Sequence, residues 1–369
     1  MTFLFYIGVT LVVLAVLFVI IVVHEYGHYK TAKLFGVRVD EFGFGYPPKI
    51  ASLFKRGETT FTLNALPFGG FVKIYGEDAV EGGDTSRALF SKPKWQQAIV
   101  LVAGVFMNVV LAWVIFFFLF VTESTAIQGH IPAQYITSNH INIKDITDGS
   151  VASEAGLQKG DRIVSIVDTM GSNHTLLSGS EFISFIQSSK GEPLSIGIER
   201  EGVMLQKELS PIHDTHAVYA IGMSLQEVRT TDVPFWVSVK YSFTTTGTIL
   251  RDIFAGLWNL IQNLFGVSLA SKAEVSGPVG IIKVIKDAMT YGSDYVLYLT
   301  ALISLNLGAL NILPIPALDG GRLFFILIEK IRGRPVNIKT ATIIHSTSFL
   351  ILVSLMVLVT VFDVMKLFR

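Results

Sequence analysis

Two histidines and a glutamate follow the pattern His24-Glu25-x-x-His28 at the end of an apolar stretch. Residues four apart lie on one face of a helix, so both imidazoles can bind one metal ion. Glu25 lies beside them and can take a proton from a water at that ion, as in the H-E-x-x-H motif of metalloproteases. A catalytic zinc brings the pKa of such a water to about 7. The pattern also arises by chance, so its setting must decide.

The setting favours a metal site. Ionisable groups at a membrane span are costly and usually functional. The alternative is a polar cap, where the helix leaves the bilayer. Such a cap explains one polar residue more readily than three at metal-binding spacing.

A third protein ligand is needed for a catalytic zinc. Asp319 adjoins the third long apolar stretch, in "NILPIPALDGG" (311–321). Pro314 and Pro316 break the helix there, and the two following glycines permit tight backbone geometry. Taken alone, Asp319 is more simply explained as the cap of a helix beginning "DGGRLFF". Because the first motif lacks a third ligand, we expect Asp319 to supply it.

The composition indicates a membrane protein with a soluble part. Of 369 residues, 51% are hydrophobic and only 16% are charged, which is too apolar for an ordinary soluble domain. The formal net charge is zero, so no acidic or basic partner is implied, and nucleic acid is not expected. The chain has no cysteine, which excludes disulfides and thiolate zinc sites.

The two motifs lie at the ends of uncharged stretches. A stretch of about 20 apolar residues is long enough to span a bilayer, and the chain has four of them. They are Phe3–Val23, Ala98–Val121, Tyr295–Leu318 and Thr340–Phe362.

The loops between these stretches differ in charge. Residues 24–97 carry ten Lys and Arg and residues 319–339 carry five, whereas residues 1–23 carry none. The positive-inside rule therefore predicts that both loops are cytoplasmic. Both termini and residues 122–294 are then extracytoplasmic, although Lys366 and Arg369 mildly oppose this orientation.

Three further segments have recognisable patterns. "TTFTLNALPFGGFVKIY" (59–75) predicts a hairpin turning at Pro67–Gly70, and "EFGFGYPP" (41–48) predicts an irregular loop at the membrane. Residues 140–212 predict a mixed α/β unit closed by Pro211. Residues 248–265 predict an amphipathic helix in the membrane interface, or alternatively one packed on a soluble core.

Together these motifs resemble the site-2 proteases, a family of intramembrane zinc proteases, and within it the bacterial regulator-of-sigma-E protease (RseP) branch. The resemblance rests on "HEYGH" (24–28), on "LDGG" (318–321) after a proline-broken span, on "SGPVGI" (276–281), and on a PDZ-like insert. It covers nearly the whole chain. The second span departs from it, because "AGVFMN" (103–108) lacks the proline that commonly follows the glycine.

The resemblance implies roles for individual residues. His24, His28 and Asp319 match the zinc ligands, and Glu25 matches the catalytic acid/base. Asn311 matches an asparagine implicated in substrate binding. The stretch around Gly43 and Gly45 resembles a membrane-reentrant region, and Leu63–Val72, which includes Leu63, Gly69, Gly70 and Phe71, resembles a hairpin that holds substrate in extended form.

The external segment resembles a single bacterial PDZ domain, chiefly through "SVASEAGLQKGDRIVSI" (150–166). Some family members carry two. Such a domain can recruit substrates by strand addition, or exclude large ones by bulk. The histidines of this segment form no metal-ligand pattern, and we expect them at the surface: His130, His140, His174, His213 and His216. His345, in the fourth span, is a candidate for a polar contact and not for a ligand.

We therefore predict a polytopic α-helical membrane protein with about four transmembrane helices, a cytoplasmic β-hairpin region and one extracytoplasmic PDZ-like domain. The expected domains are 1–121, 122–225, 226–294 and 295–369. The predicted function is zinc-dependent hydrolysis of single-spanning membrane proteins, such as anti-sigma factors or signal-peptide remnants, in the bacterial inner membrane. The alternatives are an intramembrane metal or proton transporter and a non-catalytic PDZ scaffold.

Overall fold

The computed structural model describes residues 2–77, 85–122, 133–167, 171–175, 178–213, 219–231, 233–264, 278–334, 336 and 338–367. The chain forms two compact units. Unit 1 contains residues 1–120 and 238–369, and unit 2 contains residues 121–237.

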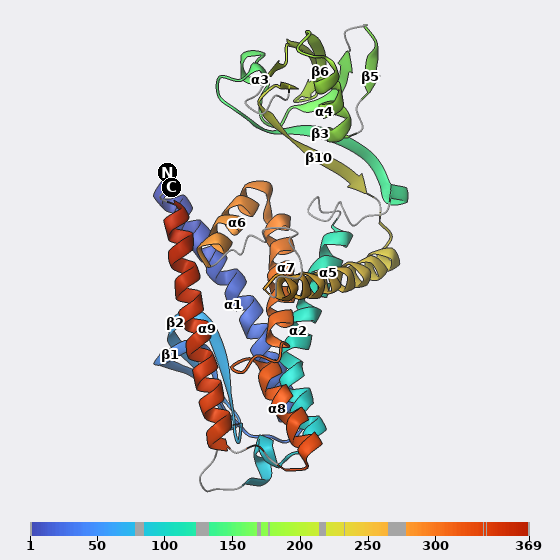
Figure 1. The fold of residues 1–369 in the computed structure, drawn as a ribbon. Helices are drawn as coiled ribbons and strands as arrows, with labels where there is room; N and C mark the ends of the chain where they lie inside the picture. Colours follow the sequence, from blue (N-terminus) through green and yellow to red (C-terminus); the bar gives the residue numbers. More distant parts are fainter. Residues whose placement is uncertain are drawn as a thin grey trace. The chain divides into compact units, whose positions relative to one another are not determined.

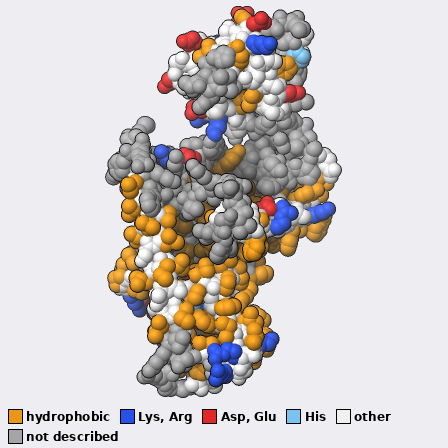
Figure 2. Space-filling model, in the orientation of Figure 1, with side chains coloured by type: hydrophobic (Ala, Val, Ile, Leu, Met, Phe, Trp, Pro, Cys, Tyr) orange, Lys and Arg blue, Asp and Glu red, His pale blue; other side chains and the backbone are white. Residues whose placement is uncertain are grey.

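Unit 1 is a set of long helices beside a small sheet (Figure 1). Among the described residues, four helices are long and apolar enough to cross a membrane: residues 7–34, 94–121, 293–311 and 343–361. Figure 2 shows hydrophobic side chains over much of this face of unit 1, with Lys and Arg at its lower end and at its sides. The described helices are α1 (Thr2–Leu34), α2 (Lys94–Val121), α5 (Phe235–Leu264), α6 (Pro278–Tyr291), α7 (Ser293–Asn311), α8 (Asp319–Arg332) and α9 (Ile338–Leu367). Short 3-10 turns cover Thr85–Arg87 and Leu89–Ser91.

The four predicted spans correspond to α1, α2, α7 and α9; α1, α2 and α9 extend beyond the predicted ranges, and α7 ends before its range does. The third was expected to reach Leu318, but α7 ends at Asn311 because Pro314 and Pro316 cannot continue it. The start of α1 and the end of α9 lie at the same end of unit 1 (Figure 1). The two termini therefore lie on the same side of the spans.

The β region agrees with the local predictions in where the chain reverses direction and differs from them in how the strands pair. Residues 41–44 of the expected irregular loop are paired within β1 (Val39–Arg56), and the chain reverses direction just after them, where Gly45 has a φ of 83°. β2 (Thr59–Ile74) also reverses direction near the predicted turn, because its residues 60–63 pair with residues 41–44 in the same order along the chain, whereas its residues 70–73 pair with them in the opposite order. A further turn, not predicted, joins β1 to β2 at Gly57–Glu58, where Gly57 has a φ of 63°. The two arms of β2 do not pair with each other as a simple hairpin would, because residues 41–44 of β1 lie between them.

The two strands pair in two registers. Residues 41–44 of β1 lie between two parts of β2: Phe44 pairs with Leu63 on one side and with Gly70 on the other. Residues 49–56 then pair with the outer side of the first half of β2. The second half of β2, residues 66–74, therefore forms one edge, and no other described strand pairs with it.

The turn of this sheet is tied to the end of α1 by charge. Arg87 donates two hydrogen bonds to the Glu58 carboxylate at 2.6 and 2.8 Å, and Lys33 donates a third at 2.6 Å. These bonds lower the pKa of Glu58 to about 2. The attachment is therefore present at neutral pH and is lost as pH falls through that value.

The amphipathic helix is longer than predicted. Residues 248–264 form the second half of α5, which begins at Phe235, and residue 265 lies outside the described residues. Trp236 and Trp258 are largely exposed. Ser238 and Ser242 are buried on the opposite face. Exposed tryptophans on such a helix are typical of a membrane interface.

Unit 2 is a mixed α/β domain (Figure 1). Its antiparallel sheet has the strand order β10-β3-β4-β6-β7, with β5 paired to β4. Its core contains Phe182 of α4 packed with isoleucines such as Ile163, Ile196 and Ile198. The elements are β3 (Ile136–Ile146), β4 (Arg162–Val167), β5 (Asn173–Thr175), β6 (Leu194–Arg200), β7 (Val203–Leu209), β8 (Ile212–His213), β9 (Tyr219–Ala220), β10 (Met223–Thr231), α3 (Val151–Glu154), α4 (Gly179–Ser188) and a 3-10 turn at Ala133–Tyr135.

The sheet of unit 2 continues beyond Pro211. β10 returns to pair with β3 along nearly its whole length, from Met223–Ile146 to Thr231–Ile136. A unit ending at residue 212 would lack this edge strand. The pairing was not predictable locally, because it joins residues about eighty positions apart in sequence.

Candidate metal centre

His24 and His28 lie one helical turn apart near the end of α1, and both are 6% exposed. Asp319, the first residue of α8, meets them from the far end of the chain. Its Oδ2 lies 3.1 Å from His24 Nε2 and 3.3 Å from His28 Nε2, and the two Nε2 atoms are 3.2 Å apart. Among the described residues, this is the one group of His, Cys, Asp and Glu that can hold a metal ion.

The spacing of these atoms fits zinc. Ligands about 2.0–2.1 Å from a tetrahedral zinc are about 3.3–3.4 Å from each other. The observed separations of 3.1–3.3 Å are close to that value. Lone pairs of three buried or half-buried ligand atoms converge on one point, and only a cation or protons can stabilise that arrangement.

The protonation of His28 also suits a ligand. Its Nδ1 donates a hydrogen bond to the Val100 carbonyl oxygen at 2.8 Å. The Nδ1 atom therefore carries the proton, and Nε2 presents its lone pair toward Asp319 and His24.

His24 has a corresponding neighbour that the sequence analysis missed. The Asn108 amide, on α2, has Nδ2 placed 3.3 Å from His24 Nδ1. Its Oδ1 is buried without a partner. If His24 Nε2 binds a metal, its Nδ1 carries a proton, and rotating the amide lets Oδ1 accept it. The available signal was that Asn108 is the only amide in the apolar stretch 98–121.

Glycines allow α1 and α2 to approach at the metal centre. A Cβ on Gly27 would lie 2.3 Å from the Ala103 carbonyl oxygen. A Cβ on Gly104 would lie 2.3 Å from His28 Nε2. α2 runs without a break through Val105. Helix packing, and not a kink at this position, brings α2 against the histidines.

Glu25 lies between the metal centre and the sheet. Its carboxylate interacts electrostatically with His24, His28 and Asp319 and accepts a hydrogen bond from the Val72 backbone amide. Gly70 of the same strand is buried against α1, where an added Cβ would lie 2.9 Å from Ile21 and 3.4 Å from Glu25 Cγ. The edge of β2 therefore reaches the carboxylate directly.

The other predicted substrate residues lie around this centre or on the sheet. Asn311, the last residue of α7, has Nδ2 placed 3.3 Å from His24 Nε2. Phe71 covers Gly43, and Tyr46 covers Gly69, because added Cβ atoms would lie 2.3 and 2.1 Å from these rings. Leu63 pairs on both sides with β1, so it offers a side chain but no free backbone edge.

The described histidines of unit 2 are not members of this group of candidate ligands. His140 is half-buried, and its burial lowers its pKa. The His174 ring packs 4.7 Å from Phe185. His130, His216 and the residues Ser276 and Gly277 of the "SGPVGI" motif lie outside the described residues.

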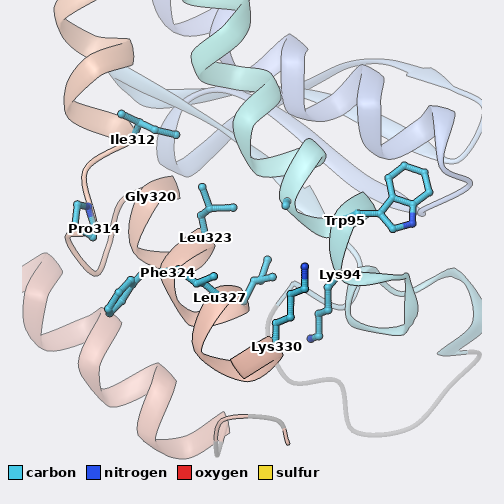
Figure 3. Close-up of a pocket in the computed structure, with 11 residues that line it drawn as sticks. Lys94, Trp95, Ile312, Pro314, Gly320, Leu323, Phe324, Leu327 and Lys330 are labelled. Carbon is cyan, nitrogen blue, oxygen red and sulfur yellow. The ribbon is translucent and has the colours of Figure 1, made fainter. Parts of the chain in front are cut away.

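An apolar pocket of 440 Å³ adjoins the loop that carries Asp319 (Figure 3). Ile312, Pro314 and Gly320 line one side. Lys94 and Lys330 lie toward the other. None of the three candidate ligands lines it, so the candidate metal centre is a separate feature.

Comparison with known proteins shows the family of the chain. Residues 12–355 match the family described as Peptidase family M50. A protein of Clostridium perfringens is 33% identical, over 94% of this chain and 95% of its own length. The zinc metalloprotease RasP of Bacillus licheniformis and the regulator of sigma-W protease RasP of Bacillus subtilis are each 28% identical over 94% of this chain and 96% and 95% of their own.

One solved structure resembles part of the chain. The PDZ domain of an SdrC-like protein from Listeria monocytogenes aligns with 24% of this chain and 90% of its own length, at 23% identity and a TM-score of 0.22.

The Gly104 packing gives a direct test of the metal centre. Replacing Gly104 by Ala places a Cβ 2.3 Å from His28 Nε2, so the ring must move. We expect zinc affinity, measured by competition with a chelator, to fall at least about tenfold. Gly308→Ala is the matched control, because its Cβ would make an ordinary 3.5 Å contact with Asn108. Equal zinc affinity in the two variants would contradict the assigned site.

Proposed function

The chain belongs to peptidase family M50 and is a membrane zinc metalloprotease, and we propose that His24, His28 and Asp319 hold its zinc while Glu25 is its acid/base. One observation carries the proposal: three ligand atoms from α1 and α8 converge at 3.1–3.3 Å beside the Glu25 carboxylate. Two of these residues lie within a helix that is long and apolar enough to span a membrane. The scissile bond is accordingly inside or beside the bilayer.

The catalytic step follows from the position of Glu25. Bound zinc would polarise the scissile carbonyl and acidify a water molecule. Glu25 takes a proton from the attacking water as its oxygen bonds to the carbonyl carbon. It then returns that proton to the amine nitrogen as the C–N bond breaks. Asn311, near His24 Nε2, is placed to donate a hydrogen bond to the substrate backbone.

The substrate must be extended to reach this site, because a helix hides its carbonyls in internal hydrogen bonds. Residues 66–74 of β2 pair with β1 on one side only. In an antiparallel strand, successive backbone groups point to alternate sides. Since the Val72 amide points toward Glu25, the free backbone groups lie beside the acid/base. We infer that the unwound substrate adds to this edge.

The substrates that fit this site are single-spanning membrane proteins. The Bacillus subtilis relative is named a regulator of sigma-W protease. Membrane-bound regulators of sigma factors are therefore one class for this chain, and signal-peptide remnants are another.

We place the protein in the bacterial cell membrane, with the metal centre near the cytoplasmic face. Lys and Arg are concentrated in residues 24–97 and 319–339, which supports this orientation. Both termini and unit 2 are then extracytoplasmic. Unit 2 acts as a PDZ-like domain, and its strand β10 is an edge strand of the described sheet that can accept a peptide.

Replacing Glu25 by Gln tests the acid/base role. The amide cannot accept the proton of the water, whereas the three ligands are unchanged. We expect zinc content equal to wild type and cleavage of a single-span substrate below detection, both measured on one detergent-solubilised preparation. Substantial remaining cleavage would refute the role.

Strand addition can be tested by cross-linking, because the chain has no cysteine of its own. In the Glu25→Gln background, a single cysteine at Phe71 should form disulfides with substrate cysteines near the scissile bond, mainly at alternate positions. A cysteine at Lys55, on the opposite outer segment of the sheet, is the control. Equal cross-linking at both positions would argue against addition to the 66–74 edge.

Deleting the part of unit 2 from β3 to β10 tests whether the PDZ-like domain excludes large substrates or recruits normal ones. The metal ligands all lie in unit 1, so zinc content should be retained. A size filter predicts that cleavage extends to substrates with folded ectodomains, and we expect this outcome because the active site lies near the cytoplasmic face. Loss of normal substrates, with bulky ones still rejected, would instead show recruitment.

A further inference from the structure

The loop between α7 and α8 sets the direction in which Asp319 enters the metal centre. It packs tightly on the first turn of α8: a Cβ on Gly320 would lie 2.2 Å from the carbonyl oxygens of Ile312 and Leu313. The Leu318 amide donates to the Ile315 carbonyl at 3.1 Å. A small change of backbone within this loop must therefore move Asp319.

Ala317, two residues before Asp319, has an unfavourable backbone conformation. Its φ is 84°, in the region that favours glycine, and it is one of three non-glycine residues with positive φ among those described. The other two, Lys190 and Glu201, lie in unit 2. Such conformations persist when surrounding contacts hold them, and they concentrate at functional sites.

The contact that holds Ala317 comes from α9. The Ala317 backbone amide donates a hydrogen bond to His345 Nδ1 at 3.0 Å. The His345 ring also packs 5.3 Å from Phe325 of α8. The expected polar contact of His345 is therefore confirmed, and it falls on the loop that supplies a metal ligand.

α9 also contacts α6, but most of its surface is exposed. None of the residues in its most apolar window within 343–361 is buried inside unit 1. Leu350 and Ile351, on the turns after His345, are 66% and 61% exposed. The contact from His345 to the loop is thus a specific polar link between a weakly packed helix and the metal centre.

We propose that His345 is a positioning residue for the metal centre. His345 accepts a hydrogen bond from the Ala317 backbone amide and so stabilises the left-handed conformation of Ala317. This conformation directs Asp319 toward His24 and His28. Because His345 belongs to α9, the geometry of the third ligand depends on where α9 lies against α8. The proposal rests on the proposed role of Asp319 as a zinc ligand.

The test uses the full chain in detergent and two readouts: zinc affinity by chelator competition, and the visible absorption spectrum after cobalt substitution. His345→Leu removes the acceptor and should weaken zinc binding about 10–100-fold, with an altered cobalt spectrum. His345→Asn keeps an acceptor near the position of Nδ1 and should restore both. Ser346→Leu, at the next and exposed position of α9, is the matched control and should resemble wild type.

A second substitution distinguishes positioning from general stability. Glycine adopts a φ of 84° without support, so adding Ala317→Gly to His345→Leu should recover most of the zinc affinity and the cobalt spectrum. Wild-type values for His345→Leu, or a defect that neither Ala317→Gly nor His345→Asn relieves, would overturn the proposal. Asp319→Ala serves as the reference. If that variant binds zinc like wild type, the ligand assignment itself fails, which is a separate result.

Discussion

The structure depends on bringing three electron-rich ligand atoms together in an apolar helical bundle. Two come from adjacent turns of α1, and the third comes from a residue 295 positions later. Their lone pairs face each other within 3.3 Å and are largely removed from water. Only a bound cation or protons make this arrangement favourable. The close approach of α1 and α2 at Gly27 and Gly104, and the turn before α8, serve that convergence.

The small sheet solves a second problem, which is access of a peptide to a site at membrane depth. A strand edge in such surroundings is tolerable only where protein or water covers it. Here the Val72 amide at the edge is satisfied by the Glu25 carboxylate. The same edge that would pair with a substrate is thus bonded to the acid/base when substrate is absent. Gly70 makes the contact possible, because any side chain there would push the strand from α1.

The third ligand depends on weaker support than the first two. His24 and His28 are fixed by a continuous helix and by partners on α2. Asp319 follows an irregular loop whose Ala317 has positive φ and is held from α9. Because only the loop before Asp319 is held from α9, the position of Asp319 is more sensitive to a shift of α9 than the positions of His24 and His28 are.

The sequence alone predicted the four long apolar helices that the structure contains, because hydropathy is a local property. It also nominated the proposed ligands and acid/base, because motif spacing is local as well. It did not determine the path of the chain from residue 41 to 74 or the closure of unit 2 by β10, because those pairings join distant residues. The contacts of Asn108 with His24 and of His345 with Ala317 likewise became known only from the tertiary structure. A single polar residue in an apolar helix shows that a partner is needed, but packing decides which partner it meets.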